Sequence, residues 1–158
     1  MIGSVLGFFL ELLYRKITQN KWIKPGVFKG IYLPLYGLGL VICYFVYNLD
    51  VNIVLKLILI GNLLTLIEFI CGVVFIKYFK INMWDYSNNF LNYKGLICFK
   101  FSVYWLIIGL FFLTCIFPFV TFCVFNVRCI IYLMYFFYMI LISDVLYTLV
   151  VLFLNKYC

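Results

Sequence analysis

Residues 53–76 read IVLKLILIGNLLTLIEFICGVVFI, and this stretch decides the fold class. It carries only two charged side chains, Lys56 and Glu68. An α-helix rises about 1.5 Å per residue, so about 20 apolar residues cross a hydrocarbon core of roughly 30 Å. A barrel strand would alternate apolar and polar residues, and this stretch does not. It therefore predicts a membrane-spanning helix.

Four further apolar stretches flank this one, at residues 1–14, 31–49, 96–117 and 129–154. The first is short for a full crossing, so it is a short span, a half-inserted helix or the end of a longer one. The sequence predicts an all-α fold: one transmembrane helix bundle over residues 1–158, with about five spans and with loops at 15–30 and 77–95. Pro118 is expected to end the fourth span, although that span could instead continue to about Val124.

Composition excludes a soluble domain. Of the 158 residues, 68% are hydrophobic and 11% are charged, whereas soluble domains are roughly 45–50% apolar and about 25% charged. Ten of the twelve basic residues fall in the two loops, near them or after the last span; Lys56 and Arg128 are the exceptions. The positive-inside rule then places both loops and the C-terminus in the cytoplasm, and the N-terminus outside. An anionic membrane surface accounts for the net charge of +7, so no nucleic-acid partner is predicted.

Several absences narrow the chemistry. The chain has no histidine, no G-x-x-x-x-G-K-[ST] run and no D-x-D cluster. Imidazole catalysis, most metal sites and ATP binding by a Walker loop are thereby excluded, and no metal or cofactor is predicted. An ATP-driven function would need a partner ATPase.

Two spans carry small and polar residues along one helical face. At about 100° per residue the members of each set fall within a narrow arc. The first set is Gly61, Asn62, Thr65, Glu68 and Gly72; the second is Gly95, Cys98, Ser102, Trp105 and Gly109. We expect the two faces to meet, since small residues let membrane helices approach closely. Helix packing alone would explain such faces.

Three acids lie in or beside apolar spans, where a charge costs about 2.5–3.5 kcal/mol at the bilayer centre. Glu11 has an apparent partner in Arg15, four residues along the same helix. Glu68 has no basic residue near it in its own span, so it is protonated or meets another helix. Asp144 has the least defined neighbours.

The loops hold the densest polar and aromatic group, Trp84-Asp85-Tyr86-Ser87, followed by Asn92 and Gly95. An interfacial aromatic belt would explain the rings. The acid between two aromatics and the later turn also favour a loop folded back against the bundle. With Tyr36 from the Pro- and Gly-rich entry to the second span, these residues predict a polar pocket that faces the cytoplasm. Its candidate residues are Glu11, Arg15, Tyr36, Glu68, Trp84, Asp85, Tyr86, Ser87, Asn92, Ser102 and Trp105.

This pattern resembles the ABC-transporter type IV family of small bacterial multi-pass membrane proteins. The resemblance runs from Gly7 to about Gly109. It rests on Gly7, Glu11, Tyr14, Arg15, Pro25-Gly26, Gly30, Pro34-Leu35-Tyr36-Gly37, Glu68 and Gly72, and above all on Trp84-Asp85-Tyr86-Ser87, Asn92, Gly95, Ile97-Cys98, Phe101-Ser102 and Trp105. It implies a bacterial plasma membrane location and a transport role, and it supplies no catalytic residues.

Three functions remain open. The chain could be a membrane subunit or accessory of a transport system that works with a partner ATPase or as a homo-oligomer. It could be a structural or regulatory assembly protein. It could also be a lipid-modifying enzyme in which Glu68 or Asp85 is a general base and Arg15 binds phosphate, although the missing histidine and metal cluster disfavour this. Membrane lipids are expected neighbours in each case.

Overall fold

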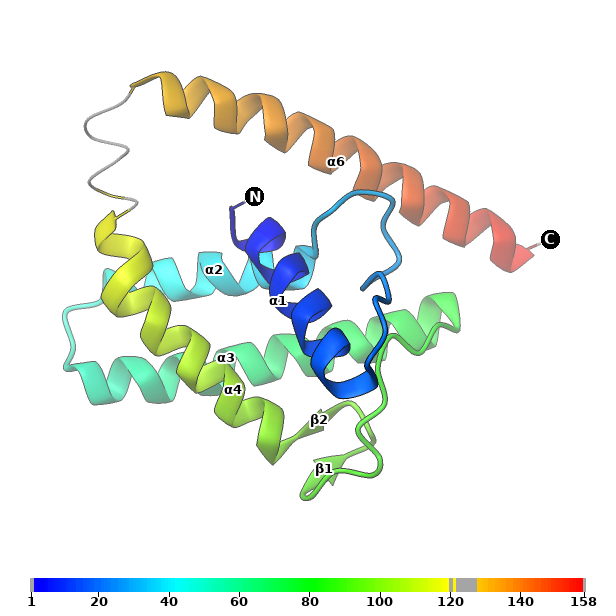
Figure 1. Ribbon diagram of the computed structural model, residues 1–158, viewed down its shortest axis with the longest axis horizontal. Helices are drawn as coiled ribbons and strands as arrows, with labels where there is room; N and C mark the ends of the chain where they lie inside the picture. The colour runs from blue at the N-terminus through cyan, green and yellow to red at the C-terminus, as the bar shows by residue number, and fades with distance from the viewer. Residues whose placement is uncertain (1, 120, 122–127, 158) are drawn as a thin grey trace. The chain divides into compact units, whose positions relative to one another are not determined.

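The computed structural model describes residues 2–119, 121 and 128–157, and helices dominate it (Figure 1). Five α-helices lie in these residues: α1 Ile2–Gln19, α2 Pro34–Tyr47, α3 Ile53–Val74, α4 Phe99–Phe111 and α6 Arg128–Tyr157. Two π-helical turns continue α3 and α4, η1 Phe75–Phe79 and η2 Phe112–Ile116. The strands β1 Asn92–Tyr93 and β2 Ile97–Cys98 form a short hairpin. The predicted all-α class is confirmed in these residues.

The chain forms two compact units. Unit 1 comprises Met1–Leu38 and Val127–Cys158, and unit 2 comprises Gly39–Asn126. The boundary falls inside α2. Each unit is described by itself below.

Three helical stretches in the described residues are long and apolar enough to cross a membrane. They are Ile53–Phe79, Phe99–Phe119 and Tyr135–Leu154, with 27, 21 and 20 residues. These lengths support a multi-pass helical membrane protein. The number of spans and their orientation stay predictions.

The first two predicted spans form helices whose limits differ from the apolar stretches. Helix α1 continues past residue 14 to Gln19, so part of the predicted loop 15–30 is helical. Helix α2 has 14 residues and covers about 21 Å, short of a typical crossing. Pro34 suits its first position, because proline lacks the amide hydrogen that would be unbonded there.

Unit 2 is built on α3 and α4, which lie against each other over most of α4 (Figure 1). A β-carbon on Gly61 would lie 2.5 Å from Leu106 Cδ2, and one on Gly72 would lie 2.9 Å from Leu96 Cδ2. The Thr65 hydroxyl donates to Ser102 Oγ at 3.1 Å. The prediction that the two small and polar faces meet is therefore confirmed. Two members of these sets are exceptions. The exposed side chain of Asn62 donates to Ile58 O of its own helix at 2.8 Å, and Gly95 lies before α4, against Asp85.

The expectation that Pro118 ends the fourth span is wrong, since the helix continues to Phe119. The residues before it form the π-helical turn η2, in which an amide bonds to the carbonyl five residues earlier instead of four. The Phe117 amide, for example, donates to Phe112 O. Proline lacks an amide donor, so it is tolerated more readily where the α-helical ladder is already interrupted. The alternative end at Val124 lies outside the described residues.

The loop predicted at 77–95 differs from expectation at both ends. The η1 turn extends the third helix to Phe79, where Lys80 ends it with a φ of 59°. At the other end β1 and β2 pair antiparallel, Asn92 with Cys98 and Tyr93 with Ile97, so α4 begins at Phe99 rather than at residue 96. Lys94, Gly95 and Leu96 connect the strands; Lys94 and Gly95 have φ values of 55° and 68°, and the Leu96 amide donates to Tyr93 O at 3.1 Å. Two consecutive positive φ angles are typical of a type I′ turn, which suits the twist of a hairpin.

Candidate functional site

A buried carboxylate lies at the centre of unit 2. Glu68, on α3, is 3% exposed. Its Oε1 accepts a hydrogen bond from the Tyr86 hydroxyl at 3.0 Å, and its Oε2 accepts one from Trp105 Nε1 at 3.0 Å. The donors come from the loop before the hairpin and from α4. Glu68 therefore joins three parts of the unit, and each of its oxygens has a donor.

The loop reaches Glu68 because several local contacts hold it. Trp84 Nε1 donates to Leu96 O at 2.9 Å, and the Tyr86 amide donates to Gly95 O at 2.8 Å. The Tyr86 ring stacks on Phe101 of α4, with centroids 4.3 Å apart and planes 13° apart. The predicted fold-back of this loop against the helices is confirmed by these contacts.

Asp85, Ser87 and Asn92 shape the loop rather than approach Glu68. Asp85 Oδ1 accepts the Ser87 amide at 2.9 Å, and this hydrogen bond lowers the pKa of the exposed Asp85 carboxyl. Asn92 Nδ2 donates to Ser87 O at 2.9 Å. Gly95 lies against the Asp85 carboxylate, where a β-carbon would stand 2.9 Å from Oδ1, and its positive φ also favours glycine.

Ser102 lies one turn before Trp105 on α4. Its hydroxyl donates to Cys98 O at 3.2 Å and accepts from Thr65. Of the predicted site residues, unit 2 thus brings Glu68, Tyr86 and Trp105 into direct contact, and the others support the loop or the helix pair.

The other three predicted residues form a separate group in unit 1. Arg15 Nε pairs with Glu11 Oε1 at 3.0 Å, and both side chains are 23% exposed. The Tyr36 hydroxyl donates to Glu11 Oε2 at 3.3 Å. Glu11 thus holds the start of α2 to α1. A single pocket that joins this group to Glu68 stays a prediction.

Unit 1 contains a polar cluster around Asp144, and the sequence did not indicate which residues would bond to this acid. Asp144 of α6 accepts hydrogen bonds through Oδ2 from the Tyr32 hydroxyl and, at 2.9 Å, from the Gly30 amide. Thr148 donates to Asp144 Oδ1 at 3.4 Å. Asp144 was recognisable as an acid in an apolar span, but Tyr32 and Gly30 lie 112 and 114 residues away in sequence. The acidic residue was the only signal.

Among the described residues, no three Cys, Asp or Glu side chains gather closely enough to hold a metal ion. In unit 2 the buried Glu68 carboxylate instead bonds to the loop that precedes the hairpin. This arrangement can hold the exposed face of the loop in one position, because Glu68 links the loop to both α3 and α4.

Comparison with known proteins gives one match. The family described as Putative ABC-transporter type IV matches residues 1–149, a longer stretch than the residues from Gly7 to Gly109 that carried the resemblance. No curated protein and no solved structure matches the chain. Because the match covers most of its length, the chain belongs to the family described as Putative ABC-transporter type IV.

Proposed function

We propose that the chain is a membrane subunit or accessory of a transport system and that residues 81–98 dock a partner ATPase. The sequence contains no Walker motif, so ATP-driven transport requires a second protein. The observation that carries the proposal is the hydrogen bond from Tyr86 to the buried Glu68, which fixes this loop against α3 and α4.

The loop has an apolar tip. Phe90 is 77% exposed and Leu91 is 66% exposed, beside the hairpin that begins at Asn92. Large apolar side chains held outward on a fixed loop are typical of a protein contact, and aromatic residues are enriched among residues that dominate interface energies. The positive-inside rule places the loop in the cytoplasm, where an ATPase would reach it.

Glu68 fits an anchor better than a general base. A base must reach a substrate proton, yet Glu68 is 3% exposed and both its oxygens accept hydrogen bonds from rings of the protein. Asp85 is exposed, and its Oδ1 serves the turn at Ser87. These contacts favour docking over the enzymatic alternative.

The test is to purify the C-terminally tagged full-length protein from native membranes and to identify copurifying proteins by mass spectrometry. Phe90→Ser removes the more exposed side chain of the apolar tip, and Asp85→Asn removes a charge while an oxygen remains for the Ser87 amide. Val51→Ser and Asp50→Asn are matched controls on the exposed loop between α2 and α3. We expect an ATP-hydrolysing subunit with the wild type and both controls, and its loss with Phe90→Ser and Asp85→Asn.

If the wild type comes out alone or only with copies of itself, docking of an ATPase is wrong. The assembly role would then be the better explanation of the packed helices. Retention of the ATPase by Phe90→Ser would place the contact elsewhere on the chain and would refute the role of this loop.

A further inference from the structure

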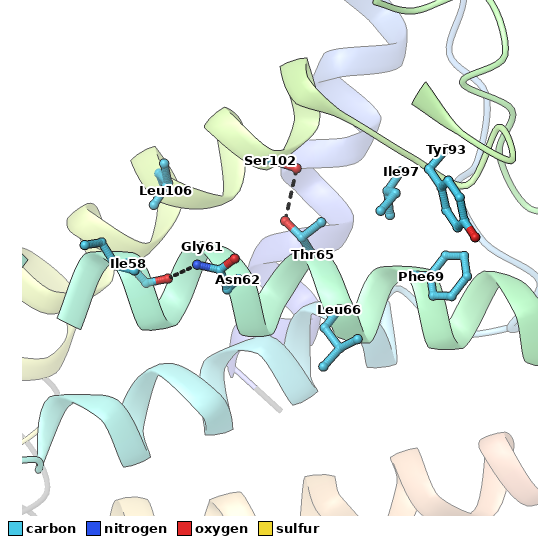
Figure 2. Close-up of a pocket in the computed structure, with 10 residues that line it drawn as sticks. All are labelled: Ile58, Gly61, Asn62, Thr65, Leu66, Phe69, Tyr93, Ile97, Ser102 and Leu106. Carbon is cyan, nitrogen blue, oxygen red and sulfur yellow. Dashed lines mark hydrogen bonds between the residues drawn. The ribbon is translucent and has the colours of Figure 1, made fainter. Parts of the chain in front are cut away.

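A pocket of about 600 Å³ opens on the surface of unit 2 between α3, α4 and the hairpin (Figure 2). Ile58 and Leu106 lie at one end, and Phe69, Tyr93 and Ile97 lie at the other. Pockets that bind small ligands measure about 300–1,000 Å³, so this one is large enough for part of a lipid.

The pocket presents a mostly apolar surface, although Asn62, Thr65, Ser102 and the hydroxyl of Tyr93 belong to its lining. Thr65 and Ser102 bond to each other at 3.1 Å, and Asn62 donates to Ile58 O at 2.8 Å (Figure 2). Since these groups are already paired within the protein, the lining offers an occupant chiefly aliphatic and aromatic contacts. An acyl chain matches that lining better than a polar solute does.

The position of the pocket also favours a lipid. It lies along Ile53–Phe79 and Phe99–Phe119, two of the stretches long enough to cross a membrane. From Ile58 to Phe69 the lining extends about 16 Å along α3. A side pocket of that length within the apolar part of a span is open to lipid chains.

A basic side chain lies at the hairpin end of the pocket, although the Asp85 carboxylate also lies against the hairpin, at Gly95. Lys94 is exposed, and its Nζ lies 5.4 Å from the centroid of the Tyr93 ring, which lines the pocket. No side chain caps the N-terminus of α4, which begins two residues after Ile97, so its partial positive charge adds to that of Lys94. None of the residues that line the pocket is charged.

We propose that this pocket binds one acyl chain of an anionic phospholipid, whose phosphate lies beside Lys94. The charge complementarity at the hairpin end selects an anionic head group, and the apolar lining holds the chain. This binding needs no partner ATPase, so it goes beyond the transport role proposed above.

The test uses full-length protein reconstituted in vesicles of phosphatidylcholine with a minor share of phosphatidylglycerol. After gentle extraction, native mass spectrometry counts the retained lipids and the copies of the chain. Lys94→Gln removes the charge, and Lys77→Gln is its control, because Lys77 lies 5.6 Å from the Tyr78 ring outside the pocket. Leu66→Trp narrows the pocket, and Ile70→Trp is the control for it. The two side chains are similarly exposed, at 52% and 49%, but only Leu66 lines the pocket.

We expect the wild type to retain phosphatidylglycerol in preference to phosphatidylcholine. Lys94→Gln should reduce that preference about fivefold, the effect of about 1 kcal/mol for one basic residue near an anionic lipid. Leu66→Trp should retain neither lipid, and both controls should behave as the wild type.

Retention of both lipids in the vesicle ratio would overturn the proposal, as would a preference that Lys94→Gln and Leu66→Trp leave unchanged. A wild-type dimer that Leu66→Trp dissociates would show that a second copy of the chain fills the pocket, and it would overturn the proposal as well. The copurification experiment on Phe90→Ser tests the tip of the loop, whereas Lys94→Gln and Leu66→Trp test the pocket, so either proposal can fail alone.

Discussion

The hydrogen bond from Trp105 to Glu68 provides a direct test of how the buried carboxylate is held. Trp105→Phe keeps an aromatic ring on α4 and removes the Nε1 donor that lies 3.0 Å from Glu68 Oε2. Trp105 is 6% exposed, so water cannot readily replace the donor. A hydrogen bond to a charged group contributes about 1.5–3 kcal/mol, against about 0.5–1.5 kcal/mol for a neutral pair. We expect Trp105→Phe to lower the free energy of unfolding by about 1.5–3 kcal/mol, plus the effect of the smaller ring.

A double-mutant cycle separates the two contributions. In a Glu68→Gln background the acceptor is neutral and the change in ring size is the same, so Trp105→Phe should cost about 1 kcal/mol less than in the wild type. The assay is equilibrium unfolding in mixed micelles with increasing dodecyl sulfate, followed by far-UV circular dichroism. A difference between the two backgrounds below about 0.3–0.5 kcal/mol is within ordinary additivity. That result would contradict the prediction that Trp105 donates to an ionised Glu68.

Three further predictions concern the other contacts. Tyr32→Phe removes a hydrogen-bond donor to Asp144 and should lower the free energy of unfolding by about 1.5–3 kcal/mol in the same unfolding assay. An unchanged free energy of unfolding would mean that this hydrogen bond does not stabilise unit 1. Gly109→Ala places a methyl group too close to an α3 side chain and should cost about 1–3 kcal/mol; unchanged stability would show that the helices separate easily. The pKa of Asp85 is lowered by the Ser87 amide, so the turn is stabilised above the unfolded pKa of Asp85 and loses this stabilisation as the pH falls through the lowered folded value. The chemical shift of the Ser87 amide should follow that titration, and a titration at the ordinary aspartate pKa would contradict it.

The contact between α3 and α4 could be predicted because helical periodicity fixes which side chains share a face. Thr65 and Ser102 were each assigned to such a face, and they bond to each other. The acid Glu68 could likewise be expected to need a partner, and Trp105 on the facing helix donates to it. Local sequence therefore accounts for most of this helix pair.

The hairpin and the cluster at Asp144 could not be predicted for different physical reasons. Strands of two residues are too short to show an alternating pattern. The turn also uses Lys94 at a positive φ, which is uncommon for a residue with a side chain, so the usual Asn-Gly signal is missing. The bond from Tyr32 to Asp144 joins residues 112 apart, and no local pattern specifies such a pairing.

One buried side chain connects the two proposals for unit 2. Tyr86 ties the loop to Glu68, and the same loop carries both the exposed Phe90 and the hairpin with Lys94. A change at Glu68 should therefore disturb partner docking and lipid selectivity together, because it releases the segment that positions both. Phe90→Ser and Lys94→Gln alter only exposed side chains and leave that link intact. Loss of both properties with Glu68→Leu, which removes both acceptor oxygens, but of one each with the two surface variants, would identify Glu68 as a positioning residue for the loop. If Glu68→Leu spared both properties, the loop would be held mainly by its stacking on Phe101 and by the contacts of its own backbone.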